Sequence, residues 1–284
     1  MCLQVLAAGS RRAIPIYPNF RAVRPLLRLL HHPRRPECAI ETIVSLGGDR
    51  RLIVNTQNLV EWDIFFTGFE PEVRRVICTS IKPGHDAIDI GANGGVHTVA
   101  MARAAGNGSV LACEPNPQAQ SRLRQNLALN GIKNVVQSNA AVLDEERPVT
   151  LYVPQDSQHA AGASLFAGMH KQLRENQAVT VAGTTIDKLV SSYGLRKIDL
   201  IKIDVEGFEG PVLRGARETL RSQHPKIIFE YTRDWWNKLG YSLPQVTNDL
   251  KAIGYTKIVQ LSRNGPRRLP SGLAGRMNVL AEFD

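Results

Sequence analysis

A glycine-rich turn followed by an acid is the first part of the sequence that could support chemistry. The turn reads Gly91-Ala92-Asn93-Gly94-Gly95 and follows an apolar run, and Glu114 ends the next apolar run. Gly91 and Gly95 let the backbone approach a ligand closely, and Asn93 tolerates left-handed geometry. A carboxylate at the end of the second strand of such a unit accepts hydrogen bonds from both hydroxyls of a ribose.

The spacing of the glycines indicates which ligand the turn could hold. A pyrophosphate site has the pattern G-x-G-x-x-G, but Asn93 and Val96 stand at the second and third glycine positions. No GK[ST] follows, which excludes a nucleoside-triphosphate loop. We therefore expect a nucleoside without phosphates, S-adenosylmethionine, rather than the NAD of a dehydrogenase. A structural alternative stays open, in which Glu114 caps the helix at 117–130 and Asn93 only forms the turn.

A second group of acids ends two later apolar runs. Lys202, Asp204 and Glu206 alternate along the segment 198–206, and Glu230 ends the following run. If these runs are neighbouring parallel strands, Asp204 and Glu230 lie on one rim, beside the methyl group of the cofactor. Methyl transfer to a hydroxyl requires removal of a proton whose pKa is of the order of water's, about 15.7. A carboxylate or imidazole at this rim could act as the base.

Three interpretations of these acids are retained. We expect Asp204 to be the base or to orient the acceptor, with Glu206 and Glu230 in support and His97 as a further candidate base. A divalent cation would lower the pKa of the acceptor instead, although the sequence does not require one and no metal ligand is assigned. In the structural alternative, Asp204 pairs with Lys202 and Glu206 caps the helix that follows.

The elements that must position these residues alternate along the chain. Apolar runs predict strands at 86–90, 109–113, 134–137, 198–204, 226–231, 255–261 and 277–283, and helices are predicted at 95–105, 117–130, 185–193, 208–222 and 243–253. This alternation is typical of βαβ units in a mostly parallel α/β sheet. The link 262–276 carries no helix pattern, so the strand 277–283 is expected to return antiparallel.

The chain divides into three predicted regions. They are a basic N-terminal extension at 1–36, an N-terminal β-hairpin region at 37–60 and an S-adenosylmethionine-binding domain at 61–284. Two further helices are predicted at 58–67 and 71–81. The stretch 142–182 breaks the alternation and is expected to be an insertion at the edge or rim of the sheet.

The sequence resembles the FkbM-type S-adenosylmethionine-dependent methyltransferases over roughly residues 60–262. The resemblance rests on DIGANGG at 89–95, EPNP at 114–117 and DLIKIDVEGFE at 199–209, with FEPE at 69–72 and VLRGA at 212–216 in support. It implies a class I methyltransferase fold, which is a Rossmann-like, seven-stranded, mostly parallel sheet with helices on both faces. Gly94 departs from the family pattern, because many members carry a bulky aliphatic residue there.

The resemblance also implies a function and further site residues. In class I methyltransferases the segment after the third strand faces the adenine, which adds Ser138, Asn139 and Ala140. The predicted cofactor residues are Asp89, Gly91, Asn93, Gly95, Glu114, Asn139 and Ala140, and the predicted catalytic residues are Asp204, Glu206 and Glu230. The expected reaction is O-methylation of a hydroxyl on a sugar, glycolipid or natural product. N-methylation of a small molecule and nucleic-acid methylation are the alternatives.

Charge and composition bear on the partners. The net charge of +9 lies mostly in residues 1–36, which hold seven Arg and no acid and leave 28 basic and 26 acidic residues elsewhere. No nucleic acid is therefore expected, and an acidic rim would repel phosphates. Arg21, Arg24 and Arg28 opposite Leu26, Leu27 and Leu30 resemble an interfacial helix, so peripheral membrane contact is one expectation and docking on the domain another. A small-molecule or glycan acceptor is expected, and Trp235-Trp236 could stack on its ring.

The cysteines and the first residues bear on location. Four Cys without a CxxC pair indicate a reducing compartment, and Met1–Ser10 lacks a secretory pattern. We expect a cytoplasmic enzyme, peripheral to a membrane if the basic extension binds one. An organelle transit peptide remains an alternative for this Arg-rich extension.

Overall fold

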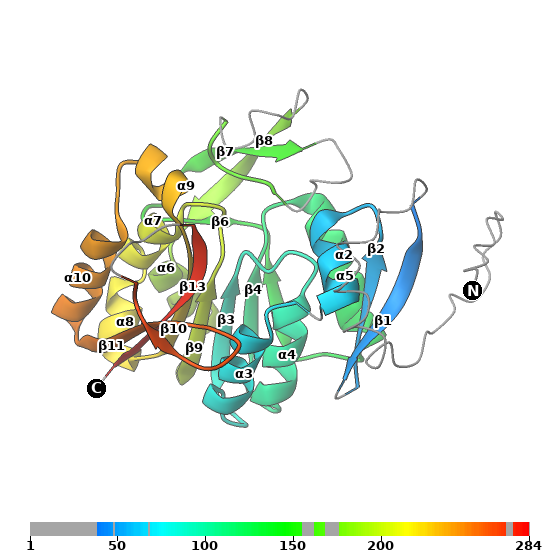
Figure 1. Ribbon diagram of the computed structural model, residues 1–284, viewed down its shortest axis with the longest axis horizontal. Helices are drawn as coiled ribbons and strands as arrows, with labels where there is room; N and C mark the ends of the chain where they lie inside the picture. Colours follow the sequence, from blue (N-terminus) through cyan, green and yellow to red (C-terminus); the bar gives the residue numbers. More distant parts are fainter. Residues whose placement is uncertain are drawn as a thin grey trace.

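The centre of the protein is an eight-stranded sheet (Figure 1), seen in a computed structural model that describes residues 39–47, 49–67, 69–154, 162–167, 176–270 and 275–283. In chain order its strands are β3 (Asp86–Ile90), β4 (Val110–Cys113), β5 (Val135–Ser138), β9 (Ile198–Ile203), β10 (Lys226–Thr232), β11 (Tyr255–Gln260), β12 (Arg267–Arg268) and β13 (Arg276–Phe283). Their spatial order is β12-β11-β13-β10-β9-β3-β4-β5.

The directions of the strands confirm the predicted sheet. β5, β4, β3, β9 and β10 pair in parallel, and β13 lies antiparallel between β10 and β11, as the missing helix pattern before it predicts. The fold is that of a class I methyltransferase. The expected seven strands are joined by an eighth, because the short β12 pairs with β11 at the edge.

Helices cover both faces of the sheet, which explains the continuous apolar character of its strands. One face packs against α3 (Pro71–Ser80), α4 (Val96–Ala105) and α5 (Pro117–Leu129). The other packs against α6 (Ile186–Tyr193), α7 (Glu209–Arg214), α8 (Arg217–Gln223), α9 (Arg233–Lys238) and α10 (Leu243–Ile253). Ile88 and Ile201 face the second group, whereas Ala87 and Leu200 face the first.

Two helices differ from the sequence prediction. The segment 208–222 forms α7 and α8 rather than one helix, and the break falls at Gly215, where an added Cβ would overlap the carbonyl oxygen of Leu143. The backbone of the insertion at Leu143 therefore lies so close to position 215 that only glycine fits there. α9 was not predicted, because it is only six residues long and its buried side is formed by a single residue, Trp236.

The N-terminal hairpin packs against α5 of the domain. It consists of β1 (Glu41–Gly47) and β2 (Arg50–Asn55), and α2 (Leu59–Thr67) follows. Leu52 and Val54 share an apolar cluster with Leu123 and Leu127 of α5. The hairpin thus shares a core with the domain, while the extension 1–36 lies outside the described residues.

The insertion forms a separate three-stranded sheet at the upper side of Figure 1. Its strands are β6 (Ala141–Val142), β7 (Pro148–Pro154) and β8 (Asn176–Thr184). β8 pairs in parallel with β6 and antiparallel with β7. In the described part of the chain, no helix has the length and apolar character needed to cross a membrane.

Candidate active site

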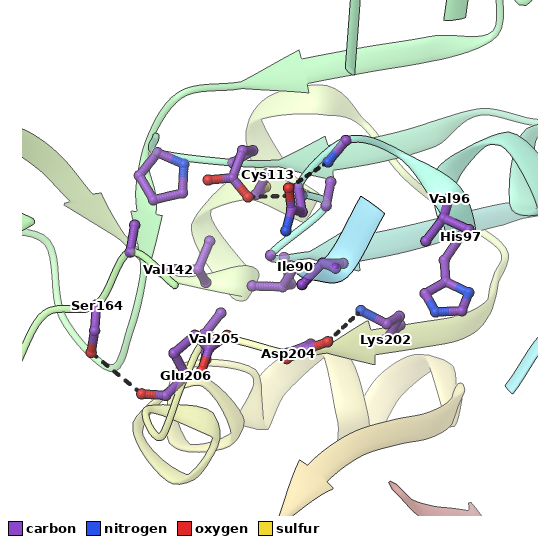
Figure 2. Close-up of a pocket in the computed structure, with 18 of the residues that line it drawn as sticks. Ile90, Val96, His97, Cys113, Val142, Ser164, Lys202, Asp204, Val205 and Glu206 are labelled. Atoms are coloured by element: carbon purple, nitrogen blue, oxygen red, sulfur yellow. Dashed lines mark hydrogen bonds and ion pairs between the residues drawn. The ribbon is translucent and has the colours of Figure 1, made fainter. Parts of the chain in front are cut away.

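A cavity lies at the carboxyl ends of β3, β4 and β9, where ligands of open α/β sheets bind. The glycine turn, Glu114, and the segment Asp204–Glu206 line it together, and Figure 2 shows Lys202, Asp204 and Glu206 on one side of the cavity. Residues of β2 and α2, including Leu52 and Ile64, complete its wall. The sequence analysis did not predict that the hairpin lines the cavity, because the sequence does not indicate where a separate hairpin docks.

The glycine turn has its expected left-handed residues, but the structure gives another reason for the glycines. Gly91 and Gly95 have φ of 77° and 87°, and Asn93 has φ of 47°. A Cβ on Gly91 would overlap the carbonyl oxygen of Asp204, and one on Gly95 would press on Leu123. Glycine is therefore required at these two positions by packing within the protein, whether or not a ligand approaches the turn.

Glu114 is placed to hold a diol. Its Oε2 accepts the backbone N–H of Asn93 at 2.8 Å and its Oε1 that of Asn116 at 2.9 Å. Each carboxylate oxygen can accept a further hydrogen bond, and Glu114 lines the cavity, so the carboxylate suits the two hydroxyls of a ribose. Burial raises the pKa of Glu114 to about 7 although the two amides oppose it. The side chain of Asn116 caps α5, so the alternative role of Glu114 as the helix cap is not needed.

The predicted cofactor residues fall into two groups. Gly91, Asn93, Glu114 and Ala140 line the cavity. The others lie outside its wall: Gly95 packs on Leu123, Asn139 is exposed, and Asp89 is buried behind the turn. Asp89 accepts the hydroxyl of Thr98 at 2.6 Å through Oδ2, while its Oδ1 has no hydrogen-bond partner among the described residues.

Lys202 neutralises the centre of the rim. Its Nζ lies 3.2 Å from Oδ2 of Asp204 and 3.8 Å from Oδ1 of Asp89. Burial lowers the pKa of Lys202, but Asp204, Asp89 and Glu70 outweigh burial, so the pKa lies above its usual value. The predicted pairing of Asp204 with Lys202 is confirmed, and Oδ2 of Asp204 accepts a hydrogen bond from Nζ of Lys202.

Glu206 has an unusual backbone and a raised pKa. Its φ of 52° is left-handed, so the extended geometry of β9 ends before it. The side chain is half-buried in the cavity wall. Burial and then the charge of Asp204 raise the pKa of Glu206 to about 8, whereas Arg276 opposes them. α7 begins at Glu209 without a side-chain cap, so Glu206 does not cap it.

Glu230 lies level with Asp204 on the neighbouring strand, as predicted, because Phe229 pairs with Ile203. It is 2% exposed and accepts a hydrogen bond from Nε of Arg276, which lines the cavity. Burial and Asp204 raise the pKa of Glu230 although Arg276 lowers it. Glu230 itself lies outside the cavity wall. Arg276 was missed, since its contact with Glu230 depends on the antiparallel return of β13.

His97 forms a buried pair that the sequence did not indicate. Its Nε2 lies 2.9 Å from Oε2 of Glu70, and Oε1 of Glu70 accepts from Nδ2 of Asn278 at 2.7 Å. Burial raises the pKa of Glu70, but His97 and then Lys202 oppose it and bring the pKa to about 2. His97 lines the cavity, and Glu70 links it to β13.

Two other expectations concern metals and aromatic stacking. Among the residues described, no group of three or more His, Cys, Asp or Glu side chains is arranged to hold a metal ion. Trp236 is fully buried between Phe229 and Tyr231, so it packs in the core and cannot stack on a sugar.

Comparison with known proteins identifies a family and several relatives. Residues 89–256 match the family described as the methyltransferase FkbM domain. The 2-O-methyltransferase NoeI of Sinorhizobium fredii is 26% identical over 169 residues, covering 56% of this chain and 67% of that protein. The hexuronic acid methyltransferase AglP of Haloferax volcanii is 28% identical over 167 residues, covering 59% of this chain and 64% of that protein. The chain thus spans about two thirds of these relatives.

Among solved structures, the crystal structure of methyltransferase FkbM from Methylobacillus flagellatus matches with a TM-score of 0.43 and 16% identity. The match covers 69% of this chain and 43% of that one.

Proposed function

Since the chain belongs to the FkbM methyltransferase family, we propose that it transfers a methyl group from S-adenosylmethionine to a hydroxyl of a sugar, glycolipid or other natural product. One observation carries the proposal. A diol-binding carboxylate, Glu114, and a carboxylate of raised pKa, Glu206, line the same cavity. The first suits a nucleoside cofactor and the second suits proton removal from an acceptor.

The cofactor half of the cavity binds and orients. When bound, S-adenosylmethionine supplies a methyl group already activated on a sulfonium. Glu114 accepts from the ribose hydroxyls, and Gly91 and Asn93 shape the turn beneath them. Ala140 and Val142 provide apolar wall for the base of the nucleoside. Rigid placement of this kind supplies much of the rate of a bimolecular transfer.

The rim half of the cavity handles the acceptor. Glu206 takes the hydroxyl proton, because a carboxylate whose pKa is about 8 is a far better base than an ordinary one. Asp204, held by Lys202, accepts a hydrogen bond from the acceptor and orients it. This reverses the sequence-based preference for Asp204 as the base, since one of its oxygens already contacts Lys202.

The rim also favours one class of acceptor. Several carboxylates at one rim suit an acceptor with many hydroxyl donors, such as a sugar. The names of two relatives, a 2-O-methyltransferase and a hexuronic acid methyltransferase, support the same class.

The test begins with calorimetry of S-adenosylhomocysteine and of NAD. We expect binding of the first only, and tight binding of NAD without S-adenosylhomocysteine would end the proposal. Transfer to a panel of sugars and glycolipids, followed by mass spectrometry of the methylated atom, then separates O- from N-methylation. Activity lost to a chelator and restored by magnesium would support a cation-assisted mechanism instead.

The base is identified by paired variants. Glu206→Gln should lower kcat by about 10²-fold or more while S-adenosylhomocysteine still binds. Asp204→Asn should lower kcat less, and Glu145→Gln, at an exposed site, should change nothing. If Asp204→Asn loses more activity than Glu206→Gln, then Asp204 is the base.

A further inference from the structure

Glu209 is a buried carboxylate outside the cavity wall, and it accepts three hydrogen bonds. It lies in the first turn of α7 and is 1% exposed. Its Oε1 accepts the backbone N–H groups of Val205 at 3.0 Å and of Gly207 at 3.2 Å. Its Oε2 accepts the indole N–H of Trp236 at 2.8 Å. Burial of a carboxylate is costly, and hydrogen bonds of this kind offset the cost.

The two amides that Glu209 holds flank Glu206. Glu206 and Gly207 have φ of 52° and 101°, so two successive residues are left-handed. For a residue other than glycine this geometry is costly and persists only when its surroundings fix it. Without Glu209, the N–H groups of Val205 and Gly207 would lose their acceptor. The carbonyl oxygen of Glu206 accepts a hydrogen bond from the hydroxyl of Ser164 at 3.4 Å. A dashed line marks this contact in Figure 2.

Trp236 fixes the other oxygen of Glu209. The indole is fully buried. Its ring centroid lies 6.0 Å from that of Phe229 in a stacked arrangement and 5.0 Å from that of Tyr231 in an edge-on arrangement. Since the ring is locked in this cluster, its N–H is a fixed donor. The carboxylate of Glu209 therefore connects the core around α9 to the loop that carries Glu206.

We propose that Glu209 is a positioning residue that holds the 205–207 loop so that Glu206 faces the acceptor. The inference rests on the proposed function where activity is measured. Its second measurement, amide hydrogen exchange in the 205–207 loop, depends only on the geometry of that loop. A displacement of about 1 Å at a catalytic group lowers a rate by about 10²-fold. Loss of the Glu209 contacts should therefore lower kcat with little effect on the proposed cofactor site, whose residues Gly91, Asn93, Glu114 and Ala140 follow β3, β4 and β5.

Glu209→Gln is a sharp test because it keeps the shape and changes one bond. The amide oxygen can still accept from Val205 and Gly207, but the amide nitrogen then faces the N–H of Trp236, a donor against a donor. Trp236→Phe removes that donor. The double variant Glu209→Gln with Trp236→Phe should therefore recover activity that Glu209→Gln alone has lost.

The experiment measures kcat at saturating S-adenosylmethionine, the affinity for S-adenosylhomocysteine, and amide hydrogen exchange in the peptide that contains 205–207. For Glu209→Gln we expect a loss of about tenfold or more in kcat, faster exchange in that peptide and little change in affinity. The double variant should regain part of the rate. Glu218→Gln, an exposed acid of α8, is the matched control and should match the wild type.

Unchanged kcat and exchange in Glu209→Gln would overturn the proposal. So would a double variant that is worse than Glu209→Gln alone, or equal losses of kcat and affinity, because these indicate general damage. If the wild-type protein binds S-adenosylhomocysteine but methylates no acceptor, the proposed function has failed separately. The exchange rates of the 205–207 amides then still decide whether Glu209 holds the loop.

Discussion

On the β3–β4 side of the cavity, Glu114 is held by backbone amides, whereas on the β9–β10 side Asp204 and Glu230 are held by charged side chains. The amides come from the turns before α4 and α5, 21 residues before Glu114 and two residues after it. The charges come from Lys202 and from Arg276, which lies 46 residues after Glu230.

This difference shows that the two halves are built at different levels of structure. The cofactor half is complete once a βαβ unit has folded, because its hydrogen-bond donors are part of that unit. The rim is complete only when several strands have assembled. Removal of one charge from the rim leaves its partner without a counter-charge, and the cost depends on how far solvent screens the pair.

Gly91 is the place where the two halves touch, so it gives the largest expected effect. In Gly91→Ala the new Cβ would overlap the carbonyl oxygen of Asp204, and φ is positive as well. We expect the free energy of unfolding in urea to fall by about 3 kcal/mol or more. Gly131→Ala is the control, since φ is also positive but the space is open, and it should cost about 1 kcal/mol. Equal costs would mean that the halves are not in contact.

The second largest effect concerns pH, because kcat and cofactor affinity should depend on different carboxylates, Glu206 at the rim and Glu114 in the cofactor half. Burial favours the protonated form of Glu206, so it is a base only above its pKa of about 8. With saturating cofactor, kcat should therefore fall about tenfold per pH unit below pH 8 and level off above it. Affinity for S-adenosylhomocysteine should weaken only below about pH 7, as Glu114 becomes protonated. A kcat profile that is flat from pH 6 to 9 would exclude Glu206 as the base.

Glu114→Ala probes the cofactor half alone. It removes a charged acceptor from the ribose, so affinity for S-adenosylhomocysteine in calorimetry should fall by about 1–3 kcal/mol. The melting temperature is the companion measurement, because the amides of Asn93 and Asn116 also lose their acceptor. Unchanged affinity would count against the ribose assignment.

The smallest expected effect belongs to Arg276→Met at the rim. The side chain of Arg276 is 54% exposed, so solvent weakens its pairing with Glu230 and a stability loss of about 1 kcal/mol is expected. Adding Glu230→Gln should restore most of this loss in urea unfolding, because the uncompensated charge is gone. A double variant that loses the sum of both single costs would show that the pair is not coupled.

The same contrast explains which parts of the site could be predicted from the sequence. The glycine turn and Glu114 were predicted with their geometry, because strand, turn and helix signals lie within one short segment. The antiparallel β13 was predicted from the missing helix before it. At the rim the sequence predicted the acids and the pairing of Asp204 with Lys202. It did not predict Arg276 or the pair of Glu70 with His97, since both depend on the assembled sheet.

Two other features were beyond the sequence for physical reasons. The break between α7 and α8 depends on the close approach of Leu143 to Gly215, a contact between segments far apart in the chain. The part of β2 and α2 in the cavity wall depends on docking of the hairpin on α5 through apolar side chains. Such packing is not specific enough in the sequence to place one element on another.

The position of β13 has a consequence for the order in which the sheet can form. β13 follows both β10 and β11 in the chain but lies between them. A nascent chain that has been synthesised as far as β11 therefore exposes the edge of β10, and β11 has no strand to pair with. An open edge of this kind is a site for aggregation until it is covered. Insertion of β13 closes the edge and brings Arg276 to Glu230, so completion of the sheet and neutralisation of the rim occur in one late folding step.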